Sequence, residues 1–176
     1  NLTAIIEGFY NNHLNKMVKD TVKVYLRGSS APFALADSSK CFLDSAGNGL
    51  FSFSNAVNSL PYYIVVKHRN AIEVWSSSAK SFVSDNLTYN FTSGSSMSYG
   101  NNSVQVDNSP VKYGFYSGDF DQDGQIDLDD IVAIQNDVNL FKTGYIKSDI
   151  NGNNLAELVD VITAMNNSND FIHSIA

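Results

Sequence analysis

Asp119-Phe-Asp-Gln-Asp-Gly-Gln-Ile-Asp-Leu-Asp-Asp130 is the stretch on which the predicted organisation of this 176-residue chain depends. Carboxylates stand at positions 1, 3, 5, 9 and 12 of these twelve residues, and Gly124 stands at position 6. Several negative charges in one turn repel one another unless a cation neutralises them, and all-oxygen ligands select a hard ion, calcium before magnesium. The stretch therefore predicts a calcium-binding loop. The alternative is an acidic surface turn that caps the start of a helix.

The predicted ligands of this first loop are five carboxylates and one backbone carbonyl. They are Asp119, Asp121, Asp123, Gln125, Asp127 and Asp130. Gln125 would offer only its carbonyl, so its side chain is free to vary, and Gly124 suits the sharp turn of such a loop. Calcium loops usually close with a bidentate glutamate at position 12; here Asp130 takes that place, and its shorter side chain can still reach an ion.

An internal repeat gives a second loop thirty residues later, Asp149-Ile-Asn-Gly-Asn-Asn-Leu-Ala-Glu-Leu-Val-Asp160. The same positions predict its ligands as Asp149, Asn151, Asn153, Leu155, Glu157 and Asp160. Asn154 replaces the glycine of position 6, where asparagine is tolerated because it enters the left-handed region readily. Ala156 at position 8 weakens the short β contact expected between the two loops. With three charges instead of five, the second loop is expected to bind calcium more weakly.

Each loop leads into a predicted amphipathic helix. The two apolar stripes have helical spacing and comprise Leu128, Ile131, Ile134 and Val138 in the first helix and Leu158, Val161, Ile162 and Met165 in the second. We expect the stripes to pack on each other. The segment before the first loop, Tyr113–Gly118, is aromatic and interrupted by glycine, so no helix is predicted to enter the loop.

Residues 1–110 have the pattern of short strands separated by turns. Val22, Val24 and Leu26 alternate with polar or aromatic residues, and residues 62–68 form the most strongly predicted strand. Residues 2–10 are predicted as the first strand. Seven or eight such strands favour an antiparallel β-sandwich of immunoglobulin-like or prealbumin-like type.

The charge is distributed unevenly along the chain. Residues 111–176 contain 3 Lys and 11 Asp or Glu, a net charge of −8, whereas residues 1–110 contain 8 basic and 7 acidic residues, a net charge of +1. The predicted fold therefore has two domains: an all-β antiparallel sandwich over residues 1–110 and a small all-α pair of loop-helix calcium motifs over residues 111–176. No basic patch recommends nucleic acid as a partner, and no apolar run is long enough to span a membrane.

The duplicated loop with only an exiting helix, carried by Gly118–Asp130 and the weaker copy Asp149–Asp160, resembles the dockerin family of bacterial secreted proteins. Residues 62–70 look like part of the X-type module that precedes dockerins in large secreted proteins. The resemblance implies two calcium ions, the second held more weakly, and an extracellular or cell-surface location. It also implies that the chain, itself expected to be monomeric, docks its parent protein onto a cohesin-like β-sandwich of another protein, with the X-type module bracing the dockerin.

In the family, partner contacts lie at loop positions 10 and 11 and along the following helix. Carried onto this chain, these positions are Leu128, Asp129, Gln135, Asn136, Leu158, Val159, Met165 and Asn166. Because the repeat is internally symmetric, either helix could face the partner.

Two other functions remain open at this stage. The duplicated unit could be a structural C-terminal module that binds calcium for stability alone, or the sandwich could bind carbohydrate through some of its aromatic residues. Those aromatic residues are Tyr62, Tyr63, Trp75, Tyr89 and Phe91. An enzyme is not expected, because the histidines His13, His68 and His173 are far apart and neither a nucleophile elbow nor a phosphate-binding loop is present.

Overall fold

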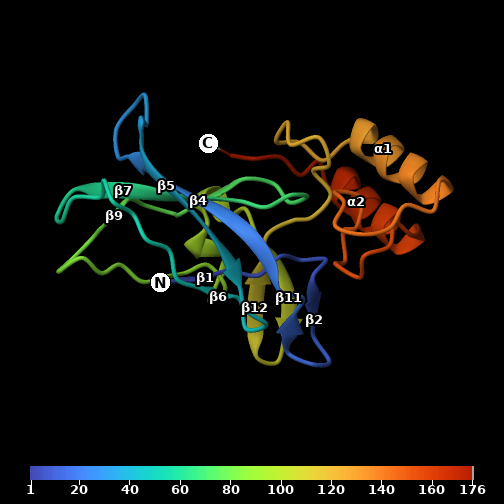
Figure 1. The fold of residues 1–176 in the computed structure, drawn as a ribbon, viewed down its shortest axis with the longest axis horizontal. Helices are drawn as coiled ribbons and strands as arrows, with labels where there is room; N and C mark the ends of the chain where they lie inside the picture. Colours follow the sequence, from blue (N-terminus) through green and yellow to red (C-terminus); the bar gives the residue numbers. More distant parts are fainter. Residues whose placement is uncertain (176) are drawn as a thin grey trace.

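The computed structural model describes residues 1–175, and β-structure predominates in it (Figure 1). Its strands are β1 (Leu2–Thr3), β2 (Tyr10–Asn11), β3 (Lys16–Met17), β4 (Asp20–Gly28), β5 (Leu35–Leu43), β6 (Asn48–Gly49), β7 (Pro61–Lys67), β8 (Val74–Trp75), β9 (Lys80–Ser81), β10 (Tyr89–Asn90), β11 (Val104–Asn108) and β12 (Val111–Gly114). Its helices are the short 3-10 turns η1 (Ser95–Met97) and η2 (Tyr99–Asn101) and the α-helices α1 (Leu128–Asn139) and α2 (Leu158–Asn169).

The main sheet has the strand order β5-β4-β7-β8, with β9 also paired to β7, and all its pairs are antiparallel. Strand β4 buries Val22, Val24 and Leu26 and turns the intervening side chains outward, which confirms the alternation predicted from the sequence. Strand β7 coincides closely with the predicted strand at residues 62–68. These two central strands contribute much of the main hydrophobic core.

The smaller sheet departs from the predicted antiparallel pattern. Its order is β10-β1-β6, and β1 pairs with β10 in parallel, Leu2 opposite Tyr89. The predicted first strand at residues 2–10 is also wrong, because β1 ends at Thr3. The residues that follow, Ala4, Ile5 and Ile6, are all fully buried. Because consecutive side chains are buried, the core surrounds this segment on both sides, and beyond Thr3 the pairing continues in this segment as the isolated bridge of Ile6 to Phe115.

The predicted fold class is wrong in its division into an all-β part and a separate all-α part. Strand β12 lies beyond residue 110 and pairs with β11 as an antiparallel hairpin. Phe115 and Ile126 belong to the main core together with Ile5, and Phe115 forms a parallel bridge to Ile6. The C-terminal third therefore contributes a strand and core side chains to the β-rich part. The division into two domains, residues 1–110 and 111–176, stays a prediction.

Helices α1 and α2 form a smaller core of their own beside the sheets (Figure 1). Its buried members are Ile134, Ile150, Val161 and Ala164. The predicted packing of the two stripes is correct for four members, Ile131, Ile134, Val138 and Val161, which belong to this core or pack against it. It is wrong for four others that are exposed, Leu128, Leu158, Ile162 and Met165. The small side chain of Ala164 lies on the buried face of α2, where it allows close packing against the backbone of Gly118.

Each loop pairs with the segment that follows the other helix. The Ile126 amide donates to the Ile172 carbonyl, and thirty residues later the Ala156 amide donates to the Lys142 carbonyl, both at 2.9 Å. The expected β contact between the loops themselves is therefore replaced by two reciprocal contacts. They arise because the segment that follows each helix runs back beside the loop of the other repeat. Neither α-helix is long and apolar enough to cross a membrane, within the described part of the chain.

Candidate metal centre and helix surface

The first loop gathers three carboxylates around one point. Oxygens of Asp119, Asp121 and Asp123 all lie within 4.8 Å of one another. Asp121 and Asp123 are exposed, whereas Asp119 is 2% exposed and its Oδ1 has no hydrogen-bond partner within residues 1–175. A buried carboxylate oxygen with no donor is costly, and a hard cation would satisfy it.

The electrostatics of this loop point the same way. Burial, together with the neighbouring charges of Asp130, Asp123 and Asp121, raises the pKa of Asp119 to about 7. Among the described residues, no Lys, Arg or His forms an ion pair with a carboxylate of this loop. A group of close carboxylates without a counter-charge fits an oxygen-coordinated divalent cation.

Asp127 and Asp130 have a second task at the start of α1. The Asp127 side chain accepts from the Asp129 amide and Asp130 accepts from the Asp127 amide, so the two form a capping box. Asp130 also accepts from the amides of Phe120 and Asp121, and burial raises its pKa. The capping alternative considered from the sequence therefore applies to these two residues, and the three carboxylates at positions 1, 3 and 5 remain for a cation.

The second loop has the same backbone with a different set of contacts. Gly124 and its counterpart Asn154 both have positive φ, 92° and 67°, which confirms the turn predicted at position 6. Asp160 accepts from the amides of Ile150, Asn151 and Glu157, and burial raises its pKa to about 6.

The amide side chains of the second loop hydrogen-bond within the loop. Nδ2 of Asn151 and Nδ2 of Asn153 both donate to Glu157 Oε1. The predicted carbonyl ligands Gln125 and Leu155 each form a β-bridge, to His173 and Thr143, which fixes their backbone.

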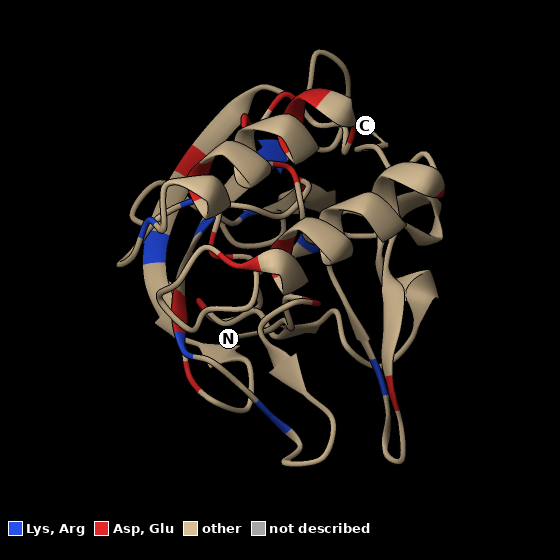
Figure 2. Ribbon diagram, turned by 90° about the vertical axis from the view of Figure 1, so that its right-hand side faces the viewer, with Lys and Arg blue, Asp and Glu red and all other residues tan. Residues whose placement is uncertain are grey.

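The predicted partner-contacting residues lie on the outer surface of the helix pair. Leu128, Asp129, Asn136, Leu158, Val159, Met165 and Asn166 are exposed, and Gln135 is half-buried. Sequence reasoning did not assign Val132 and Ile162 to this surface, yet they are 49% and 46% exposed. Their spacing of four residues from Leu128 and Leu158 was a usable signal, because such residues share a helix face. Figure 2 shows the two helices side by side on one face of the molecule, and neither contains Lys or Arg.

The aromatic residues considered for carbohydrate binding fall into two groups. Tyr62, Tyr89 and Phe91 are buried in the core. Tyr63 and Trp75 instead lie on the outer side of the main sheet, where Phe33 and Tyr99 complete a pocket of about 230 Å³.

His68 is a buried structural residue. Its Nε2 lies 3.2 Å from Asp20 Oδ2, and its ring packs edge-on against Phe9. Burial lowers the pKa of His68, although Asp20 opposes this shift.

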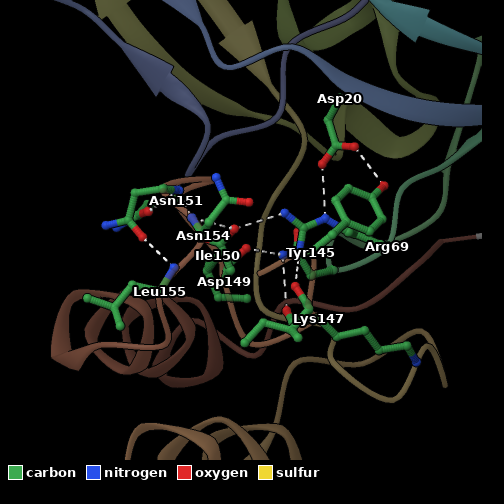
Figure 3. A network of polar contacts seen from close by, with 12 residues as sticks. Asp20, Arg69, Tyr145, Lys147, Asp149, Ile150, Asn151, Asn154 and Leu155 are labelled. Carbon is green, nitrogen blue, oxygen red and sulfur yellow. Dashed lines mark hydrogen bonds and ion pairs between the residues drawn. The ribbon is translucent and has the colours of Figure 1, made fainter. Parts of the chain in front are cut away.

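Sequence reasoning missed Arg69, which links the main sheet to the second loop (Figure 3). Its Nε donates to Asp20 Oδ2 at 2.9 Å and its Nη2 to Asp149 Oδ2 at 3.2 Å. Only its basic neighbours Lys67 and His68 marked it in the sequence, and they gave no sign of a partner eighty residues away.

Comparison with known proteins gives a likeness in structure alone. No protein-family model and no curated protein matches the chain. A chain of the crystal structure of the Coh3ScaB–XDoc_M1ScaA complex, an N-terminal interface mutant of a type II cohesin–X-dockerin complex from Acetivibrio cellulolyticus, superposes with a TM-score of 0.51 at 16% sequence identity. The match covers 97% of this chain and 95% of that chain. At this identity the likeness shows a shared fold.

Proposed function

We propose that this chain is a calcium-dependent protein-interaction module whose paired helices α1 and α2 dock onto a β-sandwich partner of the cohesin type. The observation that carries the proposal is the apolar outer surface of the helices, hereafter the helix surface: Leu128, Val132, Leu158, Val159, Ile162 and Met165, each between 44% and 67% exposed. Soluble monomers seldom leave so many large apolar side chains exposed together unless a partner covers them.

Calcium has a structural part in this proposal. Asp119, Asp121 and Asp123 would hold the ion with the carbonyl of Gln125, and the ion would neutralise the first loop from which α1 begins. The second loop is proposed to bind calcium more weakly. Because the ion and the fold of the loop depend on each other, partner binding would depend on calcium. The calcium level of an extracellular setting, which we propose for the parent protein, is high enough to fill weak loops.

The likeness to a chain of a cohesin–X-dockerin complex supports this class of partner. The six exposed apolar side chains of the helix surface support a contact that is mainly apolar.

Substitution on the helix surface tests the proposal. Ile162→Asp should lower affinity for purified type II cohesin modules, measured by calorimetry with millimolar calcium, by about thirtyfold or more, since truncated hot spots cost about 2 kcal/mol or more. Val83→Asp is the matched control, because Val83 is also an exposed apolar residue but lies outside the helices. Equal binding by the wild type with calcium and with chelator, or equal losses in the two variants, would refute the proposal.

The aromatic pocket favours carbohydrate binding as a second candidate function. Four rings from separate segments line it, and the Phe33 ring lies edge-on to those of Tyr63 and Trp75, with centroids 5.8 Å apart in both pairs. Aromatic faces of this kind suit the apolar face of a sugar ring. Trp75 is the only tryptophan, so its fluorescence reports directly on the pocket. Titration with cello-oligosaccharides and xylo-oligosaccharides should change that emission, and an unchanged spectrum with both would remove this candidate.

A further inference from the structure

Arg69 is held almost completely out of water between the main sheet and the second loop. Its side chain is 11% exposed, those of Asp20 and Asp149 are 3% and 1% exposed, and it contacts both carboxylates. Its guanidinium also donates to the Ile146 carbonyl and lies over the Tyr145 ring, 4.4 Å from the centroid. Figure 3 shows Asp20 and Asp149 on opposite sides of this group. Arginine suits such a position because its planar fork remains charged when buried and can serve two acceptors.

The carboxylate at position 1 therefore has different surroundings in the two loops. Asp149 Oδ1 accepts from the backbone amide of Asn153 at 2.9 Å. Its Oδ2 accepts from the backbone amide of Asn154 at 3.1 Å and from the Arg69 guanidinium. The equivalent Asp119 is just as buried, but its Oδ1 has no donor within residues 1–175. Both oxygens of Asp149 are satisfied by the protein itself.

Positions 3, 5 and 9 differ in the same sense. In the second loop the side-chain amides of Asn151 and Asn153 both donate to the Glu157 carboxylate, so the asparagines attract the acidic side chain. In the first loop the same positions hold Asp121, Asp123 and Asp127, which are acceptors when ionised and cannot hydrogen-bond to one another. The first loop lacks a positive charge and the second has one built in.

We infer that Arg69 takes the place of a bound cation in the second loop, so that this loop and α2 keep their structure without calcium while the first loop and α1 require it. The inference rests on the proposed calcium binding only for the first-loop half of the contrast. The chain would take one calcium ion tightly. Helix α2 would stay docked on the β-rich part, since Asn70 Nδ2 also donates to the Asp149 carbonyl at 2.7 Å and Asn167 Nδ2 to Glu7 at 2.7 Å.

Hydrogen exchange of the full chain, read by mass spectrometry on peptides over residues 119–139 and 149–169, tests this inference. In the wild type, exchange of calcium for EDTA should speed amide exchange at least about tenfold over 119–139 and leave 149–169 unchanged. In Arg69→Gln the second segment should become calcium-dependent as well. Arg27→Gln, which alters an arginine of the main sheet outside both loops, should behave as the wild type.

A charge-neutral rescue keeps the test decisive if Arg69→Gln is poorly folded. In Arg69→Gln/Asp149→Asn the position-1 side chain that faced Arg69 is neutral, and the buried Asp160 keeps its three backbone donors, so protection over 149–169 in EDTA should return to the wild-type level. Equal loss of protection over both segments in wild-type EDTA samples would overturn the inference and leave the proposed calcium function intact. No loss over either segment would instead refute the calcium requirement of the first loop. A double variant that stays unprotected without calcium would also overturn the role of Arg69.

Discussion

The two loops share a sequence pattern, a backbone and a thirty-residue spacing, but they compensate their charge in different ways. The first concentrates carboxylates around the buried oxygen of Asp119 and has no basic partner among the described residues. The second replaces two carboxylates by amides and receives the guanidinium of Arg69 from the main sheet. The difference teaches that a repeat in sequence fixes the fold of both halves, whereas the chemistry of each half depends on which charges surround it.

The largest expected effect comes from the carboxylates at position 1. Asp119→Asn should weaken calcium binding by about thirtyfold or more, because loss of one partner of a buried charged contact costs roughly 2–5 kcal/mol. Asp149→Asn should change the affinity of the same site less than about threefold, since Asp149 has protein donors. Isothermal titration calorimetry of both variants measures this. Equal losses would show that the loops are alike after all.

The next effect concerns position 8. Ile126→Ala should lower the free energy of unfolding by about 2–5 kcal/mol, because Ile126 is buried in the main core. Ala156→Gly, at the equivalent place, should cost only about 0.5–1 kcal/mol. Urea unfolding in calcium compares the two. A smaller loss for Ile126→Ala than for Ala156→Gly would contradict the larger contribution of the position-8 side chain of the first loop to stability.

The next prediction concerns how the free energy of unfolding depends on pH through His68, which lies beside Asp20 on the main-sheet side of Arg69. His68 is buried and its pKa is held below the ordinary value of 6.5, so the unfolded chain takes up its proton first as pH falls. The contribution of His68 to stability should therefore decrease below pH 6.5, by at most about 1.4 kcal/mol per pH unit for this one proton.

Asp20 adds a second loss at lower pH. Burial raises its pKa, but hydrogen bonds from His68, Tyr145 and Arg69 outweigh this and hold the pKa below its ordinary value of 3.8.

Asp119 and Asp160, whose pKa values are raised to about 7 and about 6, titrate in the same range as His68 with the opposite effect on stability. The contribution of His68 is therefore the difference between the wild type and His68→Gln, measured as urea midpoints between pH 7.5 and pH 5.5, and the variant should lack the loss assigned to this histidine. An unchanged slope in the variant would assign the effect to other groups.

The smallest effect sharpens the comparison from the other side. Asn153→Asp restores a carboxylate at position 5 of the second loop and removes a donor to Glu157. Calcium affinity there should rise by less than about tenfold, because position 153 is exposed and Coulomb interactions in water are weak. Calorimetry should then resolve a second, weak binding event. Its absence would mean that Arg69 excludes the ion even from a more acidic loop.

Local pattern predicted the local elements of this molecule well. The start of each helix followed from the repeat, and β4 and β7 followed from alternation, because both signals lie within a few residues of the structure they report. The predicted separation into an all-β and an all-α part was wrong because Val111–Gly114 and Phe115, which were assigned to the all-α part, belong to a hairpin and to the main core.

Contacts between distant parts of the chain were out of reach. The parallel pairing of β1 with β10 joins residues 87 positions apart, and the contact of Arg69 with Asp149 joins residues 80 positions apart. Neither leaves a periodic signal. The predicted packing of the apolar stripes was partly wrong for a related reason. Residue spacing defines an apolar face of a helix, but the small side chain of Ala164 decides which part of α2 can approach Gly118 closely.

The reciprocal pairing of each loop with the segment after the other helix has a consequence for biosynthesis. The first loop is translated well before Ile172, whose carbonyl holds the Ile126 amide, and before Ser174, whose amide donates to the Gly124 carbonyl. A nascent chain that has emerged only as far as α1 therefore lacks the backbone partners of its own acidic loop. Residues 172–174 must emerge before the first half can close, so both halves would mature together once this segment has been synthesised.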